Sequence, residues 1–190
     1  SGDKTFGTVG DFKASDKKDG LPVFAIKPGA ELPYAGIYLV AGGSTCYYLY
    51  GQNPTTKKHE VYLLSDAGNA AAPKAVKVFA SARKITAVAG DGVENFVAIG
   101  KMVVRATLDR KEIKAVLELP NEDITGLEFS KQAGLFYATP SVVGFIASRP
   151  YEFLKAPHSH IRLRENALYV FLGADNGVIK IGGIDAFEKT

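Results

Sequence analysis

The chain has 190 residues, of which 46% are hydrophobic, a composition that allows a sizeable buried core and excludes the disordered and fibrous classes. Twenty-three basic residues against 20 acidic ones leave a formal net charge of +3, scattered along the chain, which argues against nucleic-acid binding. The single cysteine excludes an intramolecular disulfide, and no apolar run reaches the roughly 18 residues that membrane insertion requires.

The first predicted elements are two strands near the N-terminus, Lys4–Phe12 and Leu21–Ile26, within residues 1–30. Short runs rich in Val, Ile, Tyr and Phe then alternate with turn-forming residues, which is the pattern of strands of about five residues joined by tight turns. In residues 31–84 these runs form a first, looser repeat that starts near Ile37 and has longer connections at Asn53–Lys58 and Asp66–Pro73. We find no window with the 3.6-residue apolar period of a capped helix.

Three closer repeats follow, at residues 85–123, 124–160 and 161–190. Each is expected to begin with a strand led by an isoleucine, at Ile85, Ile124 and Ile161, and to continue with a strongly apolar second strand, a third strand and a more irregular fourth strand. The fourth strand of the last repeat is expected near Ala186–Glu188. The core is expected to contain Val88, Phe96, Val97, Ile99, Leu127, Phe129, Phe136, Ala138, Leu168, Val170 and Leu172.

A period of about 40 residues with four short strands in each repeat is typical of β-propeller blades. A four-stranded blade is apolar on both faces, so it has to stack between neighbouring blades. We therefore predict a single all-β, β-propeller-like domain of about four repeats of four antiparallel strands, with a two-sheet β-sandwich as the alternative.

The segment Ile124–Thr139 resembles blades of the NHL and gluconolactonase-like propellers, in which a strand, a polar turn and a second strand follow in that order. The resemblance extends over about Ile85–Lys189 and concerns the architecture. Gluconolactonase-like propellers bind a divalent cation through carboxylate and Asn side chains around the central axis. No residues of this chain match those ligands one by one, so the resemblance assigns no catalytic residue.

Four repeats are the lower limit for a propeller, which leaves three arrangements open: a four-bladed ring, a partial propeller completed by a second chain, and the sandwich. The terminal repeats of an open array need to be covered. Residues 4–26 are therefore expected to pair with residues 161–188, in the same chain or across an interface. A protein partner or self-association is expected on the same grounds.

His158 and His160 are the most suggestive pair for a metal ion, because residues two apart in an extended segment point to the same side. Two ligands do not make a site, and solvated turn residues are the alternative explanation. Carboxylates lie mostly at predicted turns, Glu122 among them, and turn formation explains Asp91, Asp109 and Asp175. Gly42-Gly43-Ser44 lacks the Gly-Lys-Ser/Thr ending of a phosphate loop, so a hairpin turn is expected there. No cofactor is expected.

Tyrosines are dense between residues 34 and 62, and on an exposed face their rings would suit a sugar or protein ligand. Packing within the strands is the alternative, and alternation along a strand places Tyr47 opposite to Tyr48 and Tyr50. The candidate binding residues are Tyr34, Tyr38, Tyr47, Tyr48 and Tyr50.

Without a convergent catalytic motif, the sequence favours a non-enzymatic module that binds a protein or another ligand, within a larger assembly. The rival hypothesis is a metal-dependent hydrolase or lactonase of propeller type that uses turn carboxylates and His158.

Overall fold

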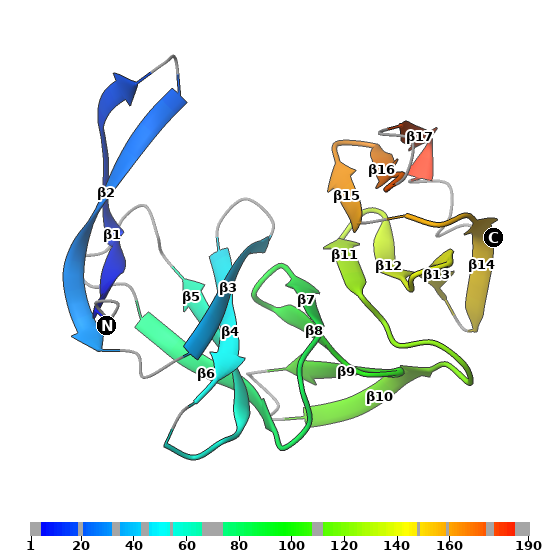
Figure 1. Cartoon of the computed structure of the whole chain (residues 1–190), viewed down its shortest axis with the longest axis horizontal. Coiled ribbons are helices and arrows are strands. Elements are labelled where there is room, and N and C mark those ends of the chain that lie inside the picture. The colour runs from blue at the N-terminus through cyan, green and yellow to red at the C-terminus, as the bar shows by residue number, and fades with distance from the viewer. Residues whose placement is uncertain are drawn as a thin grey trace. The chain divides into compact units, whose positions relative to one another are not determined.

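The computed structural model describes residues 5–18, 21–31, 35–42, 46–53, 55–65, 74–107, 112–147, 149–158, 160–173 and 177–184. In this part of the chain every regular element is a β-strand, as predicted (Figure 1). None of these residues forms a helix with the length and apolar character that a membrane span requires. The chain comprises two compact units, Ser1–Ala82 and Arg83–Thr190.

The first unit contains two antiparallel sheets. Strands β1 (Thr5–Lys18) and β2 (Leu21–Glu31) pair with each other in a two-stranded sheet and are longer than predicted. A four-stranded sheet follows, formed by β3 (Ala35–Gly42), β4 (Cys46–Gln52), β5 (His59–Ser65) and β6 (Lys74–Ser81) in chain order. This sheet is the looser first repeat, and the predicted connection at Asn53–Lys58 joins β4 to β5. The connection predicted at Asp66–Pro73 lies outside the described residues.

The second unit contains the three closer repeats, each an antiparallel meander in chain order. The first meander is β7 (Ala87–Gly90), β8 (Glu94–Ile99), β9 (Met102–Thr107) and β10 (Glu112–Glu118). The second is β11 (Gly126–Ser130), β12 (Gly134–Ala138), β13 (Val142–Ile146) and β14 (Pro150–Lys155). The third has β15 (His160–Arg164), β16 (Ala167–Phe171) and β17 (Val178–Gly182) among the described residues.

Two segments of the terminal-pairing prediction are only partly described. The fourth strand expected near Ala186–Glu188 lies outside the described residues. The pairing of residues 4–26 with residues 161–188 would join the two units, and it stays a prediction, as does the assignment of residues 1–190 to one continuous domain.

The repeat is visible in individual hydrogen bonds. Thr86 donates from its backbone N–H to the carbonyl of Ala98 at 3.0 Å, and Thr125 does the same to Ala138 at 2.8 Å. The hydroxyls of both threonines also reach the same carbonyls, and the preceding residues, Ile85 and Ile124, are buried. The Ile-Thr pair therefore leads each chain segment into the first strand of its sheet. The third repeat differs, because Ile161 lies inside β15, opposite Val170.

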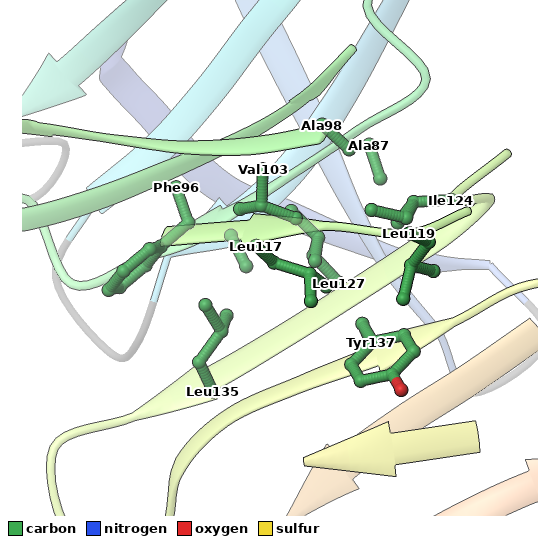
Figure 2. Close-up of a cluster of buried hydrophobic side chains, with 11 residues drawn as sticks. Ala87, Phe96, Ala98, Val103, Leu117, Leu119, Ile124, Leu127, Leu135 and Tyr137 are labelled. Atoms are coloured by element: carbon green, nitrogen blue, oxygen red, sulfur yellow. The ribbon is translucent and has the colours of Figure 1, made fainter. Parts of the chain in front are cut away.

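The core of the second unit consists of two clusters on the two faces of the sheet β11–β14. Leu127, Leu135 and Tyr137 pack toward the sheet β7–β10, and Figure 2 shows this cluster with Phe96 and Leu117 from the neighbouring sheet. Phe136 and Phe145 lie in the other cluster, with residues of β15 and β16. Alternation along β12 thus buries both faces of the sheet. Fully burying each large apolar side chain contributes about 1.5–3 kcal/mol.

The predicted core is confirmed, since nine of the eleven residues are buried and Phe129 and Leu172 are half-buried. The first strands of the three sheets are neighbours, because β11 lies beside β7 and beside β15. Successive antiparallel meanders with adjacent first strands and apolar faces stacked on each other form a propeller-like fold. The β-sandwich alternative is therefore not the arrangement of this unit.

Candidate binding pocket

A concavity with several polar lining residues lies beside the interface between the sheets β7–β10 and β11–β14, at the end where β12 finishes and β13 begins. Its volume is about 550 Å³. The connection between β10 and β11 forms one wall, and the ends of β12 and β14 form the other. We call this the Glu122 pocket, and its polar lining residues are Asn121, Glu122, Tyr137, Thr139, Ser141, Glu152 and Lys155.

A tight turn at Thr139–Val142 builds the floor of the pocket. Thr139 donates its backbone N–H to the carbonyl of Val142 at 2.8 Å, and its side-chain oxygen accepts the N–H of Val142 at 3.0 Å. Pro140 occupies the second position of this turn, where its fixed φ is favourable. The turn therefore presents the Thr139 and Ser141 hydroxyls to the same side.

Both hydroxyls donate to the carboxylate of Glu122, which comes from the connection before β11. The Ser141 hydroxyl lies 2.8 Å from Oε1 and 2.7 Å from Oε2, and the Thr139 hydroxyl donates to Oε2. The Thr139 hydrogen bond, and then that of Ser141, hold the pKa of Glu122 below its ordinary value, with a smaller contribution from the charge of His158. Glu122 is therefore an ionised acceptor at neutral pH.

Tyr137 contributes a hydroxyl whose hydrogen bonds are missing. Its side chain is fully buried, and among the described residues the hydroxyl has no hydrogen-bond partner. Burial, and secondly the charge of Glu152, raises the pKa of this phenol, so it remains a neutral O–H. Figure 2 shows the ring within the apolar cluster and its oxygen at the edge of that cluster.

The two histidines named by the sequence have separate contacts. His158 holds its Nδ1 2.7 Å from the carbonyl of Ala156, while its buried Nε2 has no partner among the described residues. His160 is exposed and stacks on Phe171, its cross-strand neighbour, at 4.2 Å between ring centroids. The described residues bring no three His, Cys, Asp or Glu side chains together as a metal site. Metal binding by the pair stays a prediction.

Three of the five candidate tyrosines have described side chains, and two of these three are buried. Tyr48 and Tyr50 are buried and Tyr47 is half-buried, so the strand-packing explanation holds for the first two. Tyr34 and the side chain of Tyr38 lie outside the described residues. A binding role for this group stays a prediction.

Sequence reasoning treated Glu122 as a turn carboxylate and did not single out Tyr137, Thr139 or Ser141. Turn formation does explain Asp91, whose Oδ1 accepts the N–H groups of Val93 and Glu94. The sequence did contain one signal for the pocket, the Thr-Pro-Ser turn directly after an apolar strand. This turn predicts hydroxyl groups at the end of the strand, but it does not predict the carboxylate to which they donate.

The stacked antiparallel meanders of the second unit give the chain a β-propeller-like fold. No protein-family model matches the sequence, and the search of curated proteins found no match. Among solved structures, the chain is similar to a gluconolactonase from Xanthomonas campestris, with a TM-score of 0.59 and 11% sequence identity. The alignment covers 82% of this chain and 60% of that enzyme. At this identity the similarity concerns the fold, and it agrees with the gluconolactonase-like resemblance of Ile124–Thr139.

Proposed function

We propose that the chain is a non-enzymatic ligand-binding module of propeller type, and that its Glu122 pocket holds a small polar molecule with hydroxyl or amine donors. The observation that carries this proposal is the buried hydroxyl of Tyr137, which lines the pocket without a partner beside an ionised carboxylate. A buried hydroxyl without a hydrogen bond costs about 1–3 kcal/mol, and such groups in folded proteins call for an explanation.

A bound molecule can satisfy both groups at once. The phenol of Tyr137 can donate to a ligand oxygen, while the oxygens of Glu122 keep lone pairs beyond those used by Ser141 and Thr139. The charges of the pocket favour neutral or cationic ligands, because Lys155 lies 3.3 Å from Glu152 and leaves Glu122 without a basic counterpart in the lining. A polyol or a small amine fits this chemistry better than a carboxylate or a phosphate.

Nuclear magnetic resonance with three small probes tests the proposal: erythritol, ethanolamine and glycolate. We expect erythritol or ethanolamine to shift the amide signals of Glu122, Thr139 and Ser141, and glycolate to leave them in place. Glu122→Gln should weaken the interaction by about tenfold or more. The control Glu118→Gln changes an exposed carboxylate of β10 outside the pocket lining and should have no effect. Shifts confined to other residues, or unchanged in Glu122→Gln, would refute the pocket as the binding site.

A metal-dependent hydrolase or lactonase is the second candidate, and the similarity in fold to the Xanthomonas gluconolactonase favours it. In that case turn carboxylates and His158 would supply ligands to a divalent cation. Metal analysis of the purified protein separates the candidates: a stoichiometric cation together with lactone hydrolysis supports the enzyme, and a metal-free, inactive protein supports the binding module.

A further inference from the structure

A second concavity opens at the opposite end of the interface between the sheets β7–β10 and β11–β14. It holds about 520 Å³ and lies where β11 and β13 end and β12 begins. We call it the basic groove. Its apolar lining residues are Phe96, Val116, Phe129, Leu135 and Ile146, and its charged ones are Glu94, Arg105, Lys114 and Lys131.

The floor of the basic groove is formed by side chains of the hydrophobic core, and some of these side chains are only partly buried. Phe96 and Leu135 are buried, which fixes the floor in place. The partly buried apolar residues that pack on this core cluster are Val116, Phe129 and Ile146, and all three line the groove. The rings of Phe96 and Phe129 lie 4.9 Å apart in a tilted pair. The groove therefore offers a preformed apolar surface, with an aromatic edge, to a side chain from outside.

The charge at the rim of the groove is positive. Arg105 and Glu94 neutralise each other through paired contacts, one of them 2.6 Å between Nη2 and Oε1. Lys114 and Lys131 are exposed, and no ion pair joins either of them to a described carboxylate. Glu112, two residues before Lys114 on β10, lines a very small cavity together with Lys114 and Arg105, outside the lining of the groove, and offsets part of the positive charge there. Two cationic groups thus flank an apolar floor.

We propose that the basic groove binds an extended acidic segment of a partner protein, which places one aromatic side chain on the floor and carboxylates near Lys114 and Lys131. An aromatic anchor in a preformed pocket supplies most of the affinity of such contacts, and complementary charges at the rim select the partner. The groove is distinct from the Glu122 pocket, so this interaction is independent of the small-ligand proposal.

Fluorescence anisotropy with the full chain tests the groove. The probe is the labelled peptide Asp-Asp-Phe-Asp-Asp, compared with Lys-Lys-Phe-Lys-Lys and Asp-Asp-Gly-Asp-Asp. We expect the acidic phenylalanine peptide to bind at least about tenfold more tightly than either comparison peptide. Lys114→Glu combined with Lys131→Glu should weaken it by at least about tenfold. Lys58→Glu combined with Lys84→Glu makes the same charge change at exposed lysines outside the groove and should have a much smaller effect.

Thermal unfolding curves of both double variants check that these surface changes leave the fold intact. Equal loss of binding in the two double variants, equal binding of the three peptides, or no binding at about 1 mM peptide would each overturn the proposal. A short oligothymidylate that binds more tightly than the acidic peptide, through the same lysines, would also overturn it in favour of a nucleic-acid partner.

Discussion

Tyr137 and Gly144 face each other across β12 and β13 with no space between them. A Cβ atom added to Gly144 would lie 2.3–2.5 Å from atoms of the Tyr137 ring, including its hydroxyl oxygen. The backbone of Gly144 is thus the surface on which the phenol rests, and the absence of a side chain there allows the hydroxyl to reach the Glu122 pocket.

Gly144→Ala should therefore destabilise the protein by about 1–3 kcal/mol through overpacking. Gly182→Ala is the matched control, because a Cβ atom at Gly182, also in a strand, meets nothing within 4 Å. Urea unfolding of the two variants measures the difference. Equal stability of Gly144→Ala and Gly182→Ala would show that the Tyr137 ring moves without cost.

The pKa of Glu122 should depend on the turn that presents Ser141. Ser141→Ala removes one of the two hydroxyl donors, so the pKa of Glu122 should rise toward its ordinary value of 4.5. Carbon-detected titration of the carboxyl signal measures this directly. Ser130→Ala is the control, since the Ser130 hydroxyl accepts the N–H of Ala133 and takes no part in the pocket.

Protonation of Glu122 should also lower the stability of the protein. Because the folded pKa of Glu122 is lowered, its stabilisation is present above pH 4.5 and is lost as the pH falls through the folded pKa. The free energy of unfolding should therefore vary less with pH in this acidic range for Ser141→Ala than for the parent. An identical pH profile would mean that Ser141 does not stabilise the ionised carboxylate.

Among the elements, the strands of the second unit were predictable because the evidence for them is local. Ile85-Thr86 and Ile124-Thr125 repeat in sequence, and each pair makes the same hydrogen bonds to its own sheet. The Glu122 pocket was not predictable, because the contacts of Glu122 with Thr139 and Ser141 span 17 and 19 residues. These contacts form because the connection between β10 and β11 lies against the turn between β12 and β13. The spacing of apolar residues in the sequence does not predict that arrangement.

An ion pair joins two consecutive sheets, because Arg162 of β15 donates to Glu128 of β11 at 2.8 Å. Burial raises the pKa of Glu128, and the hydrogen bond from Arg162 partly opposes that rise. Arg162→Met should raise the pKa further and destabilise the protein by about 1–3 kcal/mol at neutral pH, since the mostly buried carboxylate loses its cation.

The loss of stability caused by Arg162→Met should become smaller as the pH is lowered. A carboxyl group with a raised folded pKa costs stability above that pKa, and the cost disappears as the pH falls toward the ordinary value of 4.5. Denaturant unfolding at several pH values checks this, with Arg149→Met as a control at an exposed arginine that makes no described ion pair. A loss of stability that does not change with pH would show that the effect comes from packing of the aliphatic part of the Arg162 side chain.

At the scale of the whole molecule, the sheet β15–β17 allows a test of the predicted pairing between residues 4–26 and residues 161–188. Among the described residues β17 pairs only with β16, whereas the other repeats have four strands. If residues 4–26 cover β17, within the chain or from a second chain, the β17 amides that do not bond to β16 should exchange slowly with solvent. Deleting residues 1–30 should then accelerate their exchange by about tenfold or more, each tenfold corresponding to about 1.4 kcal/mol.

Hydrogen exchange followed by mass spectrometry measures this, with the β12 amides, which lie inside a complete sheet, as the internal reference. Light scattering of both forms distinguishes the two modes of covering: loss of a dimer on deletion assigns the covering strand to a second chain. Fast exchange of the outer β17 amides before deletion would exclude both modes.

The local pairing of the strands also orders events during synthesis. Every described strand pairs only with strands next to it in sequence, so the sheet β7–β10 can complete its hydrogen bonds as soon as Glu118 has left the ribosome. The side chains that cover its apolar face, Leu127, Leu135 and Tyr137, emerge only afterwards. The face of β7–β10 that these side chains cover is therefore exposed until they have been synthesised, and during that interval a chaperone has apolar surface to bind.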